Sequence, residues 1–124
     1  MSSIPLVPTP EVWQHILFGD VNGGGHLFGA NVESKTEFPF DWHLSRIERA
    51  IEGVQRNHIA RHGGMRVGQL EGFVDGLVLR LVLEECENGE LYLVTAYPLR
   101  GQGVHQNRGG KKVSRPLKET DMEF

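Results

Sequence analysis

GLVLRLVLEECENGELYLVTAYPL, residues 76–99, is the stretch that decides the fold, because it contains two strand-like apolar runs around Asn88 and Gly89. Asparagine followed by glycine is a strong signal for a two-residue hairpin turn, since both residues tolerate a positive φ. We therefore predict a β-hairpin in which Asn88 and Gly89 form the turn and Glu87 faces Glu90.

Counting outward from this turn sorts the side chains of the hairpin into two faces, because successive residues of a strand point in opposite directions. The count sets Val82 opposite Thr95 and Arg80 opposite Tyr97. The face expected to pack on the core carries Leu79, Leu81, Leu83, Tyr92, Val94 and Ala96. The other face carries Val78, Arg80, Val82, Glu84, Leu91, Leu93, Thr95 and Tyr97. This second face is polar at the end far from the turn, as expected where a site is built on a rigid sheet.

Two helices and two more strands are expected around the hairpin. Residues 9–11 (TPE) are typical of a helix start, because they provide a capping hydroxyl, an early proline and an acid near the positive end of the helix dipole. They predict a short helix over residues 10–18, and the apolar spacing predicts a longer one within residues 39–57, with Asp41 as its N-cap. Further strands are expected within residues 65–74 and 103–107.

The length of 124 residues and the 39% hydrophobic content are typical of one globular domain. No apolar run approaches the ~20 residues needed to cross a bilayer, and residues 1–10 lack the pattern of a secretion signal. We expect residues 1–10 to be the remnant of a linker and residues 11–124 to form the domain. The single cysteine, Cys86, excludes an intrachain disulfide and is interpreted as a small filler beside a turn.

The charge of the chain is mildly acidic overall but basic near its C-terminal end. A net charge of −3 argues against a general nucleic-acid coat protein, which depends on broad neutralisation of phosphates. Residues 100–118, however, contain no acid and six cations: Arg100, Arg108, Lys111, Lys112, Arg115 and Lys118. Two interpretations stay open for this basic stretch, a solvated tail and a local patch that faces phosphate.

A second notable stretch is HILFGDVNGGGHLFG, residues 15–29, which contains two histidines around a run of glycines. A metal site is one interpretation, but Asp20 is the only nearby acid and the spacing matches no common zinc motif. The glycine pattern does not match the usual nucleotide-binding loops. Two structural histidines are a further interpretation, and an acid–base pair formed by His15 and His26 is the alternative with a chemical rationale.

That rationale rests on proton transfer near neutral pH. Free imidazole has a pKa near 6.5, so two histidines flanking one phosphodiester can provide a base and an acid for a single displacement. A ribose 2′-hydroxyl attacking its own adjacent phosphate is the obvious reaction, and it needs no metal because the nucleophile is part of the substrate. The glycine N–H groups can stabilise the negative charge that develops on the phosphoryl oxygens.

The TAYP stretch, residues 95–98, is a third notable feature. Thr95 and Tyr97 lie two residues apart on a predicted strand and therefore share a face. A tyrosine ring can stack on a base or sugar, and a threonine hydroxyl can bond a base edge or a phosphate oxygen, as in the recognition of unpaired RNA. A tyrosine packed in the core is the competing interpretation for this stretch.

Three motifs in this order resemble the EndoU endoribonucleases, and especially the bacterial branch found as C-terminal toxin domains of contact-dependent and polymorphic toxins. The motifs are HILFGD at residues 15–20, GGGH at residues 23–26 and TAYP at residues 95–98, and the resemblance covers residues 13–100. It implies an α+β fold in which N-terminal helices precede a curved antiparallel sheet, as in the group that holds barnase, EndoU, colicin and RelE.

The resemblance also implies roles for the residues that match its motifs. His26 is expected to be the general base, His15 the general acid and Thr95 the third catalytic residue. Viral and animal members use a lysine as the third catalytic group, and no lysine in this sequence is placed there by a motif. We infer from the hairpin register that Arg80 supplies the missing positive charge.

Substrate contacts are expected at the glycine run and at the tyrosine of the TAYP stretch. Gly24, with Gly25 beside it, is expected to donate a backbone N–H to the scissile phosphate, and Tyr97 to stack on the ribose or uracil.

The implied activity is that of an endoribonuclease toxin domain that needs neither metal nor cofactor. Such an enzyme cleaves RNA, such as tRNA, at uridine and leaves a 2′,3′-cyclic phosphate. The implied partners are the RNA and a cognate immunity protein, with no membrane contact by the isolated domain, which is expected to be a monomer outside the immunity complex. The implied site of action is the cytoplasm of a target cell, reached as part of a larger toxin that is secreted or displayed on the cell surface. The alternative is a catalytically silent module of the same fold that binds RNA or protein.

Overall fold

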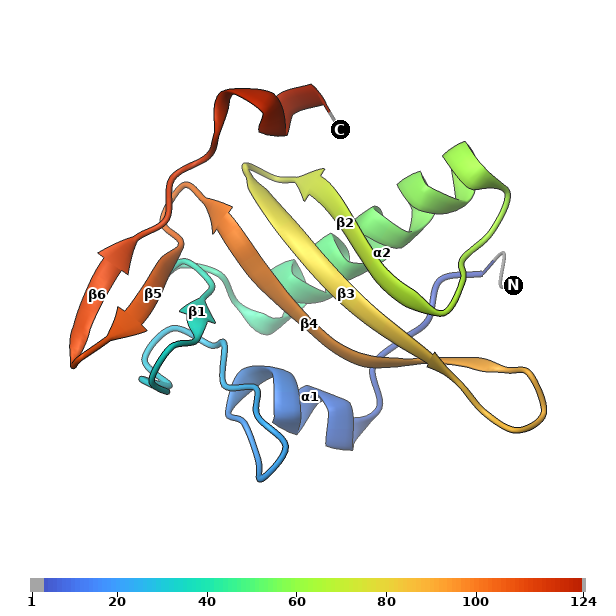
Figure 1. Cartoon of the computed structure of the whole chain (residues 1–124), viewed down its shortest axis with the longest axis horizontal. Coiled ribbons are helices and arrows are strands. Elements are labelled where there is room, and N and C mark those ends of the chain that lie inside the picture. The colour runs from blue at the N-terminus through green and yellow to red at the C-terminus, as the bar shows by residue number, and fades with distance from the viewer. Residues whose placement is uncertain (1–3, 124) are drawn as a thin grey trace.

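The protein has an α+β fold in which two α-helices near the N-terminal end combine with two antiparallel three-stranded sheets (Figure 1). The computed structural model describes residues 4–123. Its elements are α1 (Pro10–Leu17), β1 (Thr36–Glu37), α2 (Leu44–His62), β2 (Gly68–Val74), β3 (Leu77–Glu85), β4 (Leu91–Gly101), β5 (His105–Arg108), β6 (Lys111–Ser114) and the short 3-10 helix η1 (Glu119–Glu123). One sheet has the order β2-β3-β4 and the other the order β1-β5-β6. The predicted fold class is confirmed.

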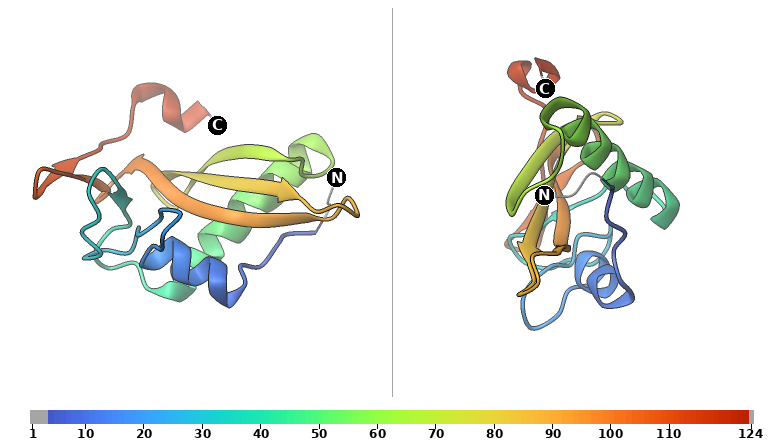
Figure 2. Two further views of the ribbon diagram at one scale, coloured as in Figure 1. Left: turned by 60° about the horizontal axis from the view of Figure 1, so that its bottom comes forward. Right: turned by 90° about the vertical axis from the view of Figure 1, so that its right-hand side faces the viewer.

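The core lies between the larger sheet and the two helices, which cover the same face of that curved sheet (Figure 2). Helix α2 contributes the buried side chains of Ile47, Ile51 and Val54, and β3 contributes those of Leu79, Leu81 and Leu83. Burying each such aliphatic side chain contributes about 1.5–3 kcal/mol, so this contact stabilises the larger sheet. Strand β2 forms one edge of the larger sheet, and β4, at the other edge, lies beside α1 and β1.

The predicted hairpin is present, but its turn contains three residues and not two. The N–H of Cys86 donates to the carbonyl of Glu90, and Gly89 adopts a positive φ of 86° at the end of the loop. A bulge then inserts one extra residue, Val94, into β4, because Leu83 pairs with Leu93 whereas Val82 pairs with Thr95. The longer turn shifts the pairing by one residue, and the bulge shifts it back. The predicted pairs Val82–Thr95 and Arg80–Tyr97 are therefore present.

Between the turn and the bulge, the predicted faces of β4 are reversed. Leu93 is only 4% exposed and packs in the core, with Leu91 packed against it, whereas Tyr92 is 42% exposed. The assignment of Tyr92 and Val94 to the core face was therefore wrong. A shift of one residue in pairing moves every side chain to the other face, and the bulge confines that shift to the segment next to the turn.

The ends of the two helices agree only in part with the sequence prediction. Thr9 caps α1 as predicted, since its side chain accepts a hydrogen bond from the N–H of Val12. Helix α2 starts later than expected, with His43 at the N-cap and no side-chain cap, so the assignment of Asp41 was wrong. The cause is a turn closed by the N–H of Trp42, which donates to the carbonyl of Pro39 and allows the Trp42 ring to enter the core.

The segment before α1, residues 4–9, lies against α2. The buried amide of Gln55 donates from Nε2 to the carbonyl of Leu6 at 2.9 Å and accepts from its N–H at 2.6 Å. The described part of the expected linker is thus held by a paired hydrogen bond. No helix within residues 4–123 combines the length and apolarity needed to cross a membrane.

Candidate active site

The glycine loop folds back on the C-terminal end of α1 and forms a short ladder with it. The N–H groups of Gly25, His26 and Leu27 donate to the carbonyls of His15, Ile16 and Leu17 at 3.0, 2.7 and 3.0 Å. The last turn of a helix normally leaves these carbonyls without partners, so the loop satisfies groups that need a donor. The two histidines of the motif are therefore fixed on neighbouring rungs of one hydrogen-bonded structure.

This ladder requires glycine at position 24. Gly24 has a φ of 84°, and a Cβ added there would lie 2.0 Å from the carbonyl oxygen of His15 and 3.2 Å from its ring carbon Cε1. Gly24 is buried, and within residues 4–123 its N–H has no hydrogen-bond partner. The N–H of Gly25, also predicted to contact substrate, is instead used in the bond to His15.

His15 is backed by a carboxylate. Its Nδ1 lies 3.1 Å from Oδ1 of Asp20, which also accepts a hydrogen bond from the N–H of Asn22 at 2.8 Å. The bonds to His15 and Asn22 lower the pKa of Asp20, so its side chain is a carboxylate at neutral pH. Because a carboxylate can only accept, Nδ1 carries the proton in this bond, and the bond holds the His15 ring in a fixed orientation.

His26 occupies the opposite kind of environment. Only 5% of the residue is exposed, and burial lowers its pKa to about 4, against a partial upward effect of the bond to Thr36. Its Nδ1 lies 2.6 Å from the backbone carbonyl of Thr36, which can only accept, so Nδ1 carries the proton of the neutral ring. The unprotonated nitrogen at neutral pH is therefore Nε2, which can accept a proton as a general base.

Tyr97 packs directly on His26, which supports a role at the site over a place in the core. The two rings stack with centroids 5.0 Å apart and an angle of 16°. The Tyr97 hydroxyl accepts a hydrogen bond of 3.2 Å from Arg80, which is also ion-paired with Glu71. Because Glu71 already neutralises this guanidinium, the structure does not support Arg80 as the missing catalytic charge. Arg80 is better described as a positioning residue for Tyr97.

Thr95 lies between the two histidine environments along β4. Its Oγ1 is buried and has no hydrogen-bond partner within residues 4–123. Leaving a buried hydroxyl unpaired costs about 1–3 kcal/mol, so this group is poised to gain a hydrogen bond from a bound ligand.

Two hollows flank Thr95 on β4. One, of about 330 Å³, is lined in part by His26, Thr36 and Tyr97. The other, of about 240 Å³, is lined by His15, Asp20, Asn22, Glu11, Val12 and residues 92–94 of β4. His15 and His26 thus line separate hollows whose walls include residues of β4 on either side of Thr95.

Lys35 is a site residue that the sequence did not reveal. It lines the hollow beside His26, and its positive charge further lowers the pKa of that histidine. Its Nζ lies 3.5 Å from the position that a Cβ on Gly23 would occupy. The only signal in the sequence was a cation soon after the glycine run, and no spacing rule connects such a residue to a histidine nine positions earlier.

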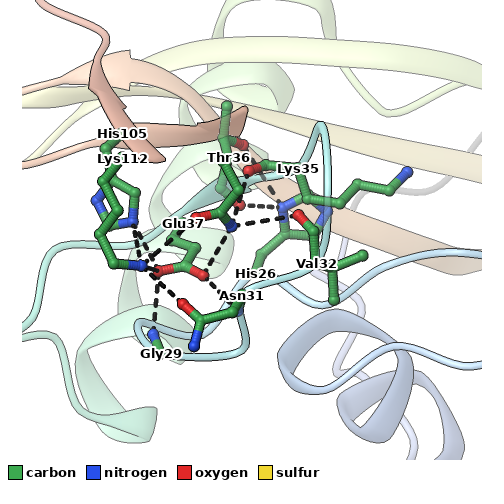
Figure 3. Close-up of polar contacts among 10 residues, drawn as sticks. His26, Gly29, Asn31, Val32, Lys35, Thr36, Glu37, His105 and Lys112 are labelled. Carbon is green, nitrogen blue, oxygen red and sulfur yellow. Dashed lines mark hydrogen bonds and ion pairs between the residues drawn. The ribbon is translucent and has the colours of Figure 1, made fainter. Parts of the chain in front are cut away.

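A buried carboxylate holds the segment after His26 in place (Figure 3). Glu37 is fully buried and accepts hydrogen bonds from the N–H groups of Gly29 and Asn31 and from the side chains of His105, Asn107 and Lys112. Burial alone raises the pKa of Glu37, but the bonds from Asn107, Gly29, Asn31 and Lys112 outweigh it and lower the pKa to about 2. The charged network ties the loop to the smaller sheet and so fixes the position of His26.

No group of three or more histidine, cysteine, aspartate or glutamate side chains within residues 4–123 is arranged to hold a metal ion. Comparison with protein-family models, with curated proteins and with solved structures finds no match for this chain. The class of protein is therefore defined here by its own features: an α+β protein with two histidines that line separate hollows on either side of a threonine of β4.

Proposed function

We propose that this protein is an endoribonuclease that cleaves RNA through attack by the ribose 2′-hydroxyl. The observation that carries the proposal is the contrast between two histidines on one ladder. His26 is neutral, with Nε2 free to accept a proton, while His15 is paired with the carboxylate of Asp20. Groups with opposite protonation tasks on either side of one site are what an acid–base displacement needs.

The proposed reaction is a transesterification. Nε2 of His26 removes the proton of the 2′-hydroxyl, and the 2′-oxygen forms a bond to phosphorus while the bond from phosphorus to the 5′-oxygen breaks. His15 donates its proton to the departing 5′-oxygen, which leaves as a 5′-hydroxyl. The products are a 2′,3′-cyclic phosphate and an RNA with a free 5′-hydroxyl, and subsequent exchange of the two histidine protons with water restores the enzyme.

Two further groups suit the charge that develops on the phosphoryl oxygens. The N–H of Gly24 and the hydroxyl of Thr95 are both donors without a hydrogen-bond partner within residues 4–123. Donors that are fixed before the reaction starts stabilise the transition state without a cost of reorganisation. Tyr97, stacked on His26, supplies an aromatic ring at the same edge against which a ribose or base can pack.

The resemblance to bacterial EndoU domains extends this proposal to a biological role. On that basis the protein is the RNase domain of a larger antibacterial toxin that acts in the cytoplasm of a target cell, prefers uridine and is neutralised by an immunity protein. Expression in the cytoplasm of a bacterium tests the role: wild-type protein should stop growth, and His26→Ala should not. Undisturbed growth with active wild-type enzyme would reject the toxin role and leave the chemistry untouched.

The chemistry itself is tested with two matched oligonucleotides. One contains a single ribouridine in a DNA strand, and the other contains 2′-deoxyuridine at the same position. We expect cleavage of the first only, with a 2′,3′-cyclic phosphate end, and the same rate in the presence of EDTA. Cleavage of both strands would exclude attack by the 2′-hydroxyl, and cleavage of neither would favour the silent binding module.

A further inference from the structure

The hollow beside His26 contains more positive charge than the proposed acid–base step uses. Its lining includes Lys35 and Arg115 together with the amide of Gln106, and it includes no carboxylate. The hollow beside His15 has the opposite character, because its lining includes Glu11 and Asp20 and no lysine or arginine. The two ends of the candidate site thus differ in the sign of their charge.

One of the two cations that line this hollow, Arg115, belongs to the basic stretch of residues 100–118. Arg100 is ion-paired with Asp121, with Nε 2.7 Å from Oδ2, and Lys112 is paired with Glu37 at 3.1 Å. Within residues 4–123 the other cations of this stretch form no ion pair, and of these only Arg115 lines the hollow. The basic stretch therefore contains ion-paired residues, exposed residues and one residue that lines the hollow.

Hydrogen bonds hold the backbone of both Lys35 and Arg115. The N–H of Arg115 donates to the carbonyl of Val104 at 2.9 Å, and its carbonyl accepts from Gly101 at 2.8 Å. The carbonyl of Lys35 accepts from the N–H of Asn107 at 3.0 Å. Lys35 and Arg115 thus line one hollow from ordered backbone, an arrangement suited to an anion such as phosphate.

We propose that Lys35 and Arg115 form a subsite for the phosphate on the 5′ side of the cleaved nucleotide. The inference rests on the proposed function, in which His26 takes the 2′ proton of that nucleotide and His15 serves the leaving group of the next one. The phosphate attached to the 5′-oxygen of the cleaved nucleotide then lies on the His26 side, where the cations are. RNA is accordingly bound with its 5′ end toward β5 and β6 and its 3′ end toward α1.

The test uses dinucleotides of 2′-deoxyuridine and adenosine, which this chemistry does not cut, in three forms: without a terminal phosphate, with a 5′-phosphate and with a 3′-phosphate. Calorimetry should show that the 5′-phosphate tightens binding by about tenfold, as for hydrogen bonds to charged groups, and that the 3′-phosphate has little effect. The slope of log Kd against log salt should increase in magnitude by about 0.7 with the 5′-phosphate.

Variants assign the effect to the two cations. The double variant Lys35→Ala/Arg115→Ala should lose the gain from the 5′-phosphate, measured as the ratio of its own Kd values for the unphosphorylated and the 5′-phosphorylated dinucleotide. The matched control Lys111→Ala/Lys118→Ala removes the same charge from exposed positions and should keep the gain. Lys35→Gln/Arg115→Gln provides a second pair that retains the side-chain stems, in case the alanine variant fails to fold as judged by thermal unfolding.

Other outcomes separate this inference from the function on which it rests. A larger gain from the 3′-phosphate, or a 5′-phosphate gain that persists in both double variants, would overturn the subsite. Equal binding of the three dinucleotides by a protein that still cuts ribouridine would overturn the subsite and leave the nuclease in place. A protein that shows the 5′-phosphate gain but cuts no RNA would support the subsite and reject the nuclease.

Discussion

The two ends of the candidate site use the same residue type in opposite ways. At the α1 end, His15 is partly exposed and bonded to the carboxylate of Asp20. At the other end, His26 is buried, stacked on Tyr97 and close to the cation of Lys35, and its pKa is lowered to about 4. The comparison teaches that burial and neighbouring charge, and not residue identity, give the two imidazoles different environments, which is the basis of the proposed division into acid and base.

The largest expected effect comes from removing either histidine. His15→Ala and His26→Ala should each lower the rate of ribouridine cleavage by about 10²- to 10⁴-fold, because each removes a proton-transfer group from the same displacement. The measurement is single-turnover cleavage of the oligonucleotide with one ribouridine. His43→Ala, at the exposed N-cap of α2, is the control and should cleave at the wild-type rate. Near-wild-type cleavage by either site variant would contradict the assignment of that histidine.

The ladder that joins the two ends can be broken at Gly24. Gly24→Ala places a methyl group against the His15 carbonyl in addition to the strain of a positive φ, whereas Gly29→Ala adds the same strain with no atom within 4 Å of the new Cβ. Positive φ costs about 1–2 kcal/mol, and overpacking adds about 1–3 kcal/mol. Urea unfolding should therefore show a clearly larger loss for Gly24→Ala than for Gly29→Ala. Equal losses would mean that the loop can relax away from α1.

The buried state of His26 predicts a pH dependence of stability. Its pKa is about 4 in the folded protein against 6.5 ordinarily, so between these values the unfolded chain binds the extra proton. The free energy of unfolding is therefore unaffected by protonation of His26 above pH 6.5. It falls by roughly 3 kcal/mol as the pH drops to 4, because protonation of His26 then favours the unfolded chain. The measurement is the difference in unfolding free energy between wild type and His26→Gln across this pH range. The other histidines are the same in both proteins, so their titration cancels in the difference. A flat difference would show that His26 is exposed enough to protonate.

A smaller effect is expected from Asp20, which acts through His15. Asp20→Asn should lower the cleavage rate by about tenfold, since a largely exposed partner contributes less than a buried one. The measurement is the pH–rate profile of single-turnover cleavage, which Asp20→Asn should change because His15 loses its carboxylate partner. Asp20→Glu should recover most of the rate. An unchanged profile in Asp20→Asn would indicate that the carboxylate only braces the loop.

The sequence predicted much of this site because its signals were local. The capping hydroxyl of Thr9, the break at the glycine run and the strand pattern of residues 76–99 depend on neighbouring residues, and each of these elements is present. The register opposite Thr95 and Tyr97 was also correct, although the turn was not. The extra turn residue and the bulge at Val94 compensate for one another, and neither leaves a distinct pattern in the sequence.

Two other incorrect predictions concern packing in the core. The N-cap of α2 moved from Asp41 to His43 because Trp42 enters the core beside Phe38, and Tyr92 moved outward because Leu93 is the better core residue. These choices depend on which side chain fills a given space, which is decided by the packing of the whole core.

By itself, the sequence determined the α+β class, the pair of histidines around a glycine loop and the strand that carries Thr95, because periodicity and turn chemistry act over a few residues. Only the tertiary structure decided which histidine is buried, that Lys35 and Arg115 meet in one hollow, and that Glu71 engages Arg80. Burial and charge pairing depend on segments up to 80 residues apart in the chain, as Lys35 and Arg115 are, so they become defined only when the core has packed.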